Sequence, residues 1–537
     1  MSAGRAEHGI WRVPAGELRW ALAISLLALL VVTLPYVVCA AGQTADYRFG
    51  WVLYDAADIY TYLAEMRQGA DGAWLLHLPF TSEDHPRALV HPFYLLLGKA
   101  GRLLGLDTLL TYHAARLLAG LILLLSAYNF FAYFTPYRAV RRLALLLTAF
   151  TAGLGWLVLI VAGQQWLGDF PVDFLIPEAF TLATLYRVPH IALTVTLMLL
   201  AALCYLEACV TARWGWAVAA GLAGVGIILL VPYAITIVWG AMGFYLITLG
   251  VRRRTLPLIE LRAALTAALV AAPALAYNLW VFNVIPAFRE WARQNVGLSP
   301  HPLHFMMSLS VPLALALAGL WSAARRGKDN WLLPAGWLLA TAVALYLPFN
   351  LQRRMILGLH PVLSLWAAAG IAQVVLPALS RRWRRPALGA IFVLLLPSNL
   401  FLLIGPLAQM PAHPEPLYQS REKLEAVAWL ATHTPAGSII LSSIEAGNFI
   451  PTRSSNWVYL GHGDVTLDSE RKLSEVRMFY SGQMPAAEMA DFLRRNRIAW
   501  VYQGVDERAL GTLQPEQYTF LEPAYSNAAV RIYRVQL

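Results

Sequence analysis

The feature that most constrains this chain is a series of apolar runs, each close to the ~20 residues that a helix needs to cross a bilayer. Only 13% of the 537 residues are charged and 58% are hydrophobic, which is too little charge for the surface of a soluble protein. We therefore predict a mainly α-helical, polytopic membrane protein with about eleven transmembrane helices. The runs cover residues 19–41, 110–134, 143–163, 191–210, 215–231, 233–250, 260–282, 304–322, 331–349, 355–377 and 387–406.

Arginine clusters mark one side of the predicted membrane. They lie in the N-terminal tail and in alternate connections between the apolar runs, as the positive-inside rule describes. With eleven helices, every cluster is cytoplasmic, the N-terminus is cytoplasmic and the C-terminus lies outside the cell membrane. The net charge of +10 therefore reflects the orientation of the helices in the membrane and does not indicate nucleic-acid binding. The clusters are Arg5, Arg12 and Arg19; Arg138, Arg141 and Arg142; Arg213; Arg252, Arg253 and Arg254; Arg325, Arg326 and Lys328; and Arg381, Arg382, Arg384 and Arg385.

This topology depends most on residues 215–250, a long apolar stretch that Pro232 interrupts. A single helix there would move every later arginine cluster to the opposite side of the membrane. Two helices keep all the clusters on one side, so the sequence favours two.

Three long connections and a polar tail lie on the opposite, outer side. The connections are residues 42–109, 164–190 and 283–303, and the first contains amphipathic segments at 58–68 and 93–105. The tail follows a proline-rich linker and alternates helical and strand patterns, which predicts a small extracytoplasmic α/β domain. We divide the chain into a transmembrane module, residues 1–406, and this domain, residues 407–537.

Two carboxylates, Asp55 and Asp58, stand at the start of an amphipathic segment in the first outer loop. If a helix begins near Asp58, then Asp58, Tyr62 and Glu65 share one of its faces. A carboxylate just beyond a membrane helix can act as a general base on a hydroxyl group. The alternative is helix capping by Asp55 or Asp58, with the neighbouring aromatic residues in the interfacial belt.

Several further polar residues of the outer loops are candidates for substrate contact. Glu83, His85 and His91 lie in the first loop, where carboxylates and imidazoles could bind a divalent metal, although their spacing matches no known ligand pattern. The alternative is a solvated polar loop. In the second loop Glu178 and His190 are candidates, and His190 could equally cap a helix.

An arginine pair, Arg353 and Arg354, breaks the charge pattern because it lies in a short turn on the predicted outer side. A lipid phosphate is its natural partner, since guanidinium groups bind phosphate oxygens bidentately and keep their charge. An ion pair with an outer-loop carboxylate, or a helix count wrong by one, would also explain the pair. In the tail, His462 and Asp464 either line an acceptor groove or form an ordinary Gly-His-Gly turn, and the turn is slightly favoured.

With these residues the chain resembles the GT-C superfamily of multispanning glycosyltransferases, which includes the protein mannosyltransferase and aminoarabinose transferase types. The segment 58–67 is similar to the acidic first-loop motif of that superfamily, and His91-Pro92-Phe93-Tyr94 resembles the Pro-aromatic helix that follows it. Arg116 lies where such enzymes often have an arginine. The usual adjacent Asp-Glu pair is spread here over Asp55 and Asp58, so either acid could be the catalytic one.

The resemblance implies transfer of a sugar from a polyprenyl-phosphate donor to a lipid, glycan or protein acceptor outside the cell membrane, with inversion. Asp58 would act on the acceptor hydroxyl, while Arg353 and Arg354 would hold the leaving phosphate. Some members use a divalent metal and others none, so no cofactor is certain. The competing interpretation is a transporter or lipid flippase, but such proteins place ionisable residues at mid-membrane, whereas most charges here lie at helix ends. A membrane sensor would leave the elaborate first loop unexplained.

Overall fold

The computed structural model describes residues 13–326, 329 and 331–537, so the predictions for Arg5, Arg12 and Lys328 lie outside the described residues. The chain forms two compact units. Unit 1 comprises Met1–Pro35, Ala115–Asn278 and Gly297–Leu407. Unit 2 comprises Tyr36–Ala114, Leu279–Val296 and Ala408–Leu537, so residues of the first loop group with residues of the C-terminal tail.

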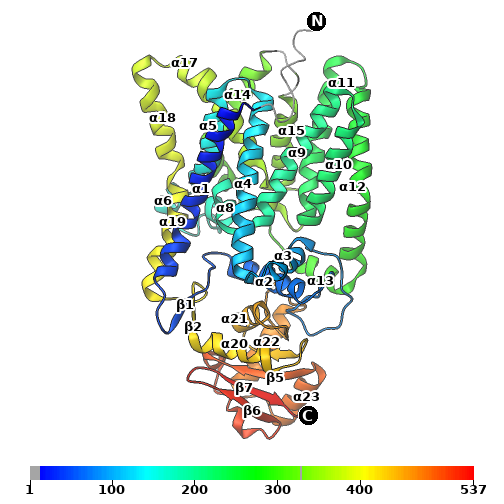
Figure 1. The fold of residues 1–537 in the computed structure, drawn as a ribbon, viewed down its shortest axis with the longest axis vertical. Helices are drawn as coiled ribbons and strands as arrows, with labels where there is room; N and C mark the ends of the chain where they lie inside the picture. The colour runs from blue at the N-terminus through cyan, green and yellow to red at the C-terminus, as the bar shows by residue number, and fades with distance from the viewer. Residues whose placement is uncertain (1–12, 327–328, 330) are drawn as a thin grey trace. The chain divides into compact units, whose positions relative to one another are not determined.

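Unit 1 is a helical bundle (Figure 1). Its helices, four of which continue into unit 2, are α1 (Ala15–Ala41), α4 (Thr108–Phe134), α5 (Arg138–Phe150), α6 (Gly155–Ala162), α7 (Val172–Leu175), α8 (Thr181–Arg187), α9 (Pro189–Thr211), α10 (Trp214–Leu230), η1 (Pro232–Ala234), α11 (Ile235–Arg253), α12 (Leu258–Val284), α14 (Pro302–Ala324), α15 (Leu332–Ala344), η2 (Gln352–Ile356), α16 (Leu359–Gly370), η3 (Ile371–Val375), α17 (Leu376–Ala378), α18 (Arg381–Leu395) and α19 (Pro397–Gln409).

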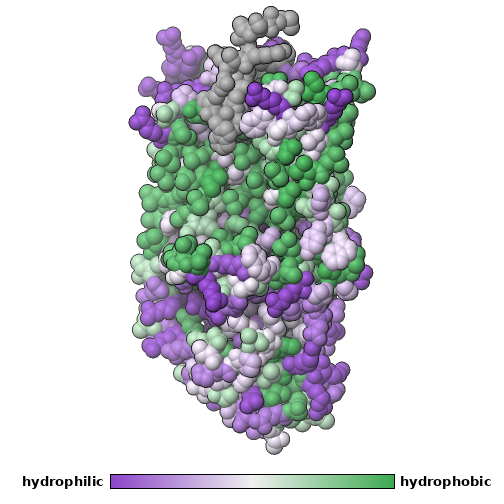
Figure 2. Space-filling model, turned by 45° about the vertical axis from the view of Figure 1, so that its right-hand side comes forward, coloured by the Kyte–Doolittle hydropathy of each residue, from purple (hydrophilic) through white to green (hydrophobic). Residues whose placement is uncertain are grey.

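The predicted polytopic helical fold is confirmed. Among the described residues, eight helices are long and apolar enough to cross a membrane, and the bent pair α18 and α19 makes a ninth. The shorter apolar helices α10 and α15 account for the two remaining predicted runs. Figure 2 shows hydrophobic side chains covering most of the bundle on the face in view. The residues 215–250 form two helices separated at Pro232, as the arginine pattern required. The exact number of crossings stays a prediction.

Two predicted spans differ from single straight helices. The run 143–163 breaks between α5 and α6, where a side chain on Gly153 would lie only 1.8 Å from the Ser308 carbonyl oxygen. This close approach of two backbones requires glycine and interrupts the helix. The run 331–349 ends early, at Ala344, because Pro348 disfavours helical backbone in the residue before it and cannot donate a backbone hydrogen bond.

The core of unit 1 is the segment around α16. In the span Gln352–Ala378, 94% of the 18-residue apolar window is buried, whereas in the span Leu258–Val284 only 22% of the corresponding window is buried. Its contact with α14 runs through two glycines: a Cβ on Gly319 would lie 2.0 Å from the Trp366 carbonyl oxygen, and one on Gly370 would lie 2.0 Å from that of Leu315. Small residues of this kind let helix backbones pack closely inside a membrane.

Ion pairs join several arginine clusters at helix ends. Arg141 lies 2.9 Å from Glu17, which brings the start of α5 to the start of α1. Arg252 and Arg253 contact Asp329 at 3.0 and 3.6 Å, which brings the end of α11 to the segment after α14. These contacts agree with the predicted grouping of the clusters, whereas the side of the membrane on which they lie stays a prediction.

Unit 2 combines helices of the outer loops with an α/β fold. Its five-stranded sheet has the order β4-β3-β5-β7-β6, parallel among the first three strands and antiparallel after them, and β1 pairs with β2 separately. The elements are β1 (Tyr47–Phe49), α2 (Ala56–Ala70), α3 (Pro92–Leu103), α13 (Pro286–Gln294), η4 (Met410–Ala412), β2 (Tyr418–Ser420), α20 (Arg421–His433), β3 (Ile439–Leu441), α21 (Ile444–Phe449), η5 (Ile450–Thr452), β4 (Trp457–Val458), α22 (Ser469–Ser481), α23 (Ala486–Arg495), β5 (Ile498–Gln503), α24 (Val505–Leu510), η6 (Pro515–Gln517), β6 (Leu521–Ser526) and β7 (Arg531–Val535).

The helices α2 and α3 of the first loop pack against each other through two glycines. A Cβ on Gly98 would lie 1.8 Å from the Met66 carbonyl oxygen, and one on Gly69 would lie 2.0 Å from that of Leu95. Because the atoms in the way are backbone, neither position can accept a side chain without separating the helices. This contact fixes α2, which carries the candidate catalytic residues.

Candidate functional site

Asp58 lies in the first turn of α2, where the helix dipole favours a negative charge. The helix begins at Ala56, two residues earlier than predicted, so Asp58, Tyr62 and Glu65 do belong to one helix. Asp55 precedes the helix in the left-handed conformation, with φ 50°, and its side chain makes no capping hydrogen bond. The interpretation of Asp55 as a side-chain cap is therefore wrong, although Asp55 stands at the cap position.

His462 of the C-terminal tail contacts Asp58. The imidazole Nε2 lies 3.3 Å from Asp58 Oδ1, and the backbone N–H of Asp464 donates to Nδ1 at 3.1 Å. Since Nδ1 accepts that bond, the ring proton of a neutral His462 must lie on Nε2, facing the carboxylate. The Asp58 side chain is 46% exposed, so a substrate hydroxyl can reach it, whereas His462 is 9% exposed. The predicted turn at His462 thus presents its side chain to the candidate base.

Glu65, about two turns after Asp58 on α2, is buried beside His91. His91 Nδ1 lies 3.0 Å from Glu65 Oε1, and burial raises the pKa of Glu65 while the imidazole acts in the opposite direction. Tyr62 stacks on Tyr94 with a centroid distance of 4.4 Å, and Trp291 of α13 meets His91 edge to face at 5.5 Å. The candidates Tyr62, Glu65 and His91 therefore lie together, among aromatic side chains.

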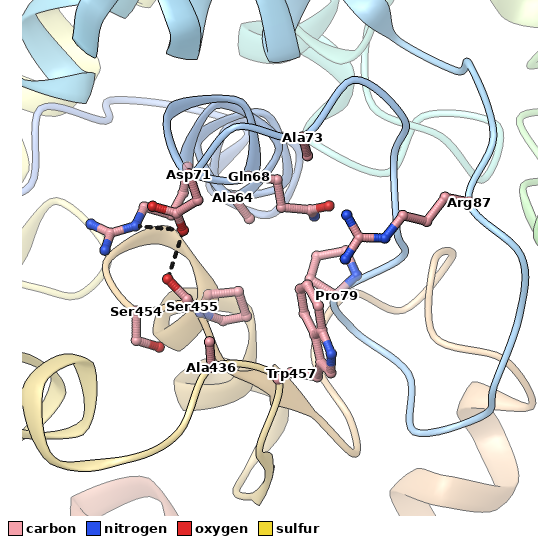
Figure 3. A pocket seen from close by; sticks show the side chains of 13 residues that line it. Ala64, Gln68, Asp71, Ala73, Pro79, Arg87, Ala436, Ser454, Ser455 and Trp457 are labelled. Carbon is pink, nitrogen blue, oxygen red and sulfur yellow. Dashed lines mark hydrogen bonds and ion pairs between the residues drawn. The ribbon is translucent and has the colours of Figure 1, made fainter.

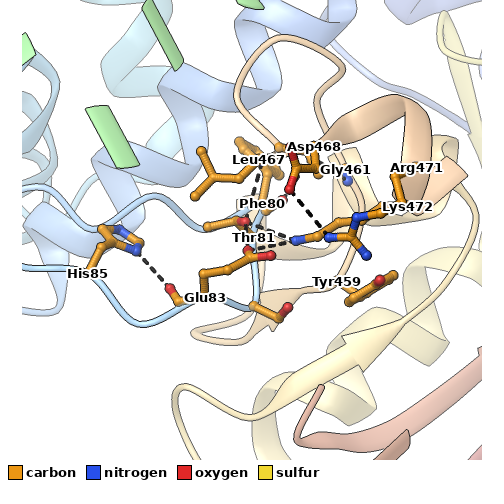
Figure 4. A network of polar contacts seen from close by, with 12 residues as sticks. Phe80, Thr81, Glu83, His85, Tyr459, Gly461, Leu467, Asp468, Arg471 and Lys472 are labelled. Carbon is orange, nitrogen blue, oxygen red and sulfur yellow. Dashed lines mark hydrogen bonds and ion pairs between the residues drawn. The ribbon is translucent and has the colours of Figure 1, made fainter. Parts of the chain in front are cut away.

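Glu83 belongs to a different network, centred on the fully buried Lys472 (Figure 4). Lys472 Nζ lies 2.7 Å from Glu83 Oε2 and 3.1 Å from Thr81 Oγ1, and 4.8 Å from the centre of the Tyr459 ring. Thr81 also donates a hydrogen bond to Glu83. These contacts join the first loop to the C-terminal α/β fold within unit 2. Glu83 therefore has a structural partner, which the sequence did not identify.

The candidate metal ligand His85 and the neighbouring Asp84 have separate partners. His85 Nε2 accepts the backbone N–H of Leu78 at 3.0 Å and its Nδ1 donates to the Glu83 carbonyl at 2.9 Å, while Asp84 binds Arg497 at 2.6 Å. In the parts of the chain that the structure describes, no three His, Cys, Asp or Glu side chains are grouped as metal ligands. The divalent metal stays a prediction from the sequence.

The Glu83–Lys472 pair predicts a pH dependence of stability. Burial raises the pKa of Glu83, but the ion pair and hydrogen bonds outweigh it and leave the pKa below its ordinary value of 4.5. The carboxylate therefore stabilises the fold above that pH, and its contribution is lost as the pH falls through the folded-state pKa. Glu83→Gln should lower the unfolding free energy by about 1–2 kcal/mol at neutral pH, less than for a fully buried pair because Glu83 is 38% exposed.

Thermal unfolding of the detergent-purified chain between pH 7 and pH 4 measures this effect. The difference between wild type and Glu83→Gln should shrink toward pH 4. Glu488→Gln, an exposed glutamate of α23, is the matched control and should unfold like wild type. A Glu83→Gln deficit that stays constant with pH would contradict the assignment.

The arginine pair lies in unit 1, in the 3₁₀ helix η2. The backbone N–H of Arg353 donates to the Gly297 carbonyl at 3.1 Å, and the backbone N–H of Gly297 donates to the Asn350 carbonyl at 2.6 Å. The side chain of Arg353 also lies against Gly297, where a Cβ would come within 3.2 Å of Nε. These bonds fix the turn that carries Arg353 and Arg354, and both side chains are only partly buried.

Three further candidates also lie in unit 1. Arg116 of α4 is 2% exposed and donates to the Leu185 carbonyl at 2.8 Å, so it ties α4 to α8. Glu178 is buried just before α8, and His190 lies in the first turn of α9, where its carbonyl accepts a bond from Thr194. Arg116 thus has a contact within unit 1, and Arg116, Glu178 and His190 all stay candidates.

No protein-family model and no curated protein matches the chain. Solved structures do. The oligosaccharyltransferase of Archaeoglobus fulgidus, tethered with an acceptor peptide, has a TM-score of 0.54 at 13% identity, over 96% of this chain and 74% of the other. ArnT from Cupriavidus metallidurans bound to undecaprenyl phosphate has a TM-score of 0.52 at 13% identity, over 97% and 98%. The arabinofuranosyltransferase AftD from Mycobacteria has a TM-score of 0.52 at 16% identity, over 97% of this chain and 42% of AftD.

This chain has the GT-C fold. The likeness extends over nearly the whole chain, so it includes both units and not the membrane helices alone. The GT-C resemblance that the first-loop acids indicated is confirmed at the level of the fold. At these identities the GT-C fold says nothing of the sugar or the acceptor.

Proposed function

We propose that this chain is a membrane glycosyltransferase that moves a sugar from a polyprenyl-phosphate donor to an acceptor hydroxyl outside the cell membrane. The observation that carries the proposal is Asp58: an accessible carboxylate, at a helix start, oriented by an imidazole. The membrane glycosyltransferases of the same fold support it, since ArnT is bound to undecaprenyl phosphate and the oligosaccharyltransferase carries an acceptor peptide. In the proposed orientation the N-terminus is cytoplasmic and unit 2 is extracytoplasmic.

The proposed reaction is a single displacement with inversion. The acceptor oxygen attacks the anomeric carbon of the donor as the bond from that carbon to the phosphate oxygen breaks. Asp58 takes the proton of the acceptor hydroxyl, and His462 holds the carboxylate in place by donating from Nε2. The polyprenyl phosphate leaves with an added negative charge. Arg353 and Arg354 would stabilise that charge by charge-assisted hydrogen bonds.

An apolar groove beside the arginine turn supports the assignment of a lipid donor. The groove has a volume of about 500 Å³, lies between α11 and α15, and reaches Met355, which follows Arg354 in the sequence. A chain of isoprene units is apolar throughout and would bury its surface there while its phosphate meets the arginines. The lining residues are Tyr233, Thr236, Gly240, Phe244, Gly336, Leu339, Ala340, Val343, Ala344, Leu347, Phe349 and Met355.

We expect the double variant Arg353→Gln and Arg354→Gln to bind undecaprenyl phosphate about tenfold or more weakly than wild type, because it loses charge-assisted hydrogen bonds to phosphate. Native mass spectrometry of the detergent-purified protein measures the retained lipid. Arg385→Gln, at an exposed arginine of α18, is the control and should bind like wild type. If the double variant retained as much undecaprenyl phosphate as wild type, the arginines would not be part of the donor site.

The function itself is tested with proteoliposomes that contain the purified protein, a labelled polyprenyl-phosphate sugar and candidate lipid, glycan and peptide acceptors. The proposal expects labelled acceptor and released polyprenyl phosphate in equal amounts. Movement of the donor across the bilayer with no transfer would instead favour the flippase interpretation. The same reaction with and without a chelator reads out metal dependence.

A further inference from the structure

Unit 2 contains a second concave site, between the C-terminal half of α2, the first loop and the segments before β3 and β4. Its volume of about 390 Å³ lies in the range of small-ligand pockets. Figure 3 shows Arg87 reaching in from the first loop, opposite Asp71 and Ser455. The pocket is lined by Ala64, Arg67, Gln68, Asp71, Ala73, Pro79, Arg87, Ala436, Gly437, Pro451, Ser454, Ser455 and Trp457.

The charge in this pocket is unbalanced. Its one carboxylate, Asp71, is 3.3 Å from Arg67 and accepts a hydrogen bond from Ser455 at 2.6 Å. Arg87 makes no hydrogen bond or ion pair with any described residue, so one guanidinium is left without a counter-charge. The nearby imidazoles of His77 and His85 add no further positive charge at neutral pH, because burial, together with nearby positive charge, lowers the pKa of His77 to about 3 and burial lowers that of His85.

The walls around Arg87 are held rigidly. Gln68 donates to the His77 carbonyl at 2.9 Å and accepts the His77 backbone N–H at 3.1 Å, so its amide is fixed at both ends. The ring of Trp457 stacks on His77 with a centroid distance of 4.4 Å, which fixes an aromatic wall. A rigid aromatic wall beside fixed amide, hydroxyl and carboxylate groups suits a compact polyol ring, which offers both apolar C–H faces and many hydroxyls.

The pocket is separate from the candidate transfer site. The pocket residues Ala64, Arg67, Gln68 and Asp71 follow Asp58 by 6 to 13 residues, which is roughly 9–20 Å along the axis of α2 at 1.5 Å per residue. A ligand in the pocket therefore lies farther along the helix and does not touch the candidate base.

We propose that this pocket binds an anionic sugar, with its carboxylate or phosphate group on Arg87 and its ring against Trp457. The shared chemistry of the two ligand types is a compact polyol that carries one anionic group. The guanidinium supplies paired donors for that group, and the Asp71, Gln68 and Ser455 side chains meet hydroxyls. The site would give this chain a means of holding a charged glycan, whichever sugar it transfers.

Saturation-transfer NMR titrations of the purified full-length protein test the proposal with three probes: glucuronate, glucose 6-phosphate and glucose. At least one of the two anions should bind, and glucose should bind about tenfold or more weakly than that anion. Preference for glucuronate identifies a carboxylate ligand, and preference for glucose 6-phosphate a phosphate ligand. Arg87→Gln should weaken binding of the preferred anion about tenfold or more toward the affinity of glucose.

Two controls keep this result distinct from the proposed function. Arg494→Gln, at an exposed arginine of α23 outside the pocket, should bind the anion like wild type, and so should Asp58→Asn. Absence of binding by both anions, equal binding of glucose, or unchanged affinity in Arg87→Gln would overturn the proposal. Loss of anion binding in Asp58→Asn would also overturn it, since the ligand would then occupy the transfer site.

Discussion

Asp58→Asn should lower sugar transfer by about 10²–10⁴-fold, the range that a general base contributes, while protein level and donor binding stay unchanged. The substitution keeps the size of the side chain and removes its charge. Asp58 is accessible and hydrogen-bonded to His462, so the amide can occupy the same place without a change of fold. Initial rates with a labelled polyprenyl-phosphate sugar, normalised to bound undecaprenyl phosphate, measure the effect.

Asp55→Asn is the matched control, because Asp55 lies three residues away and its side chain does not cap α2. It should have the milder effect. The loss of transfer in His462→Gln should lie between the losses in Asp58→Asn and Asp55→Asn, because this variant removes the group that orients Asp58 and leaves the base itself. Wild-type transfer by Asp58→Asn together with an inactive Asp55→Asn would mean that Asp55 is the catalytic acid. Full activity of both variants would count against the glycosyltransferase proposal.

Gly98→Ala should destabilise unit 2 by about 3 kcal/mol and lower transfer as well. The added Cβ would lie 1.8 Å from the Met66 carbonyl oxygen and 2.9 Å from the Ala70 nitrogen, so α2 and α3 must separate. That movement displaces the helix that carries Asp58. The thermal unfolding midpoint of the purified chain and the transfer rate of the fraction still folded measure the two effects.

Gly243→Ala is the control for the general effect of replacing a helical glycine. A Cβ on Gly243 meets nothing within 4 Å, so this variant should be neutral or more stable by up to about 1 kcal/mol. An unchanged midpoint in Gly98→Ala would mean that α2 and α3 do not pack at this distance in the protein.

Most helices could be predicted because membrane helices leave a strong local signal in the sequence. A run of apolar residues identifies each one, and Pro232 identifies the break between α10 and α11. In the tail, the sequence patterns predict helices at 420–433, 468–480 and 486–496 and strands at 438–442 and 498–502, which match α20, α22, α23, β3 and β5. Strand β6 was missed because Pro523 and exposed polar residues mask an edge strand. The break at Gly153 depends on a backbone distant in sequence, which no local pattern reports.

The candidate site was predictable only in part. A single helix carries Asp58, Tyr62 and Glu65, so the 3.6-residue period was enough to bring them together. The partners of the candidate residues come from other segments of the chain. His462 is the partner of Asp58, His91 that of Glu65, and Lys472 that of Glu83. Such pairs depend on tertiary packing, and Lys472 in particular looks like an ordinary surface lysine in its charged helix. The unpaired Arg87 was overlooked for the same reason.

The contact between Asp58 and His462 joins residues that are 404 positions apart. A ribosome adds about 5–20 residues per second, so roughly 20–80 s separate the synthesis of the two side chains. During that interval the first loop is complete and its carboxylate has no imidazole to orient it. The oriented acid therefore forms only after His462 has been synthesised, when the membrane helices described above have been made, and a chain stopped before that residue would keep Asp58 without the imidazole that orients it.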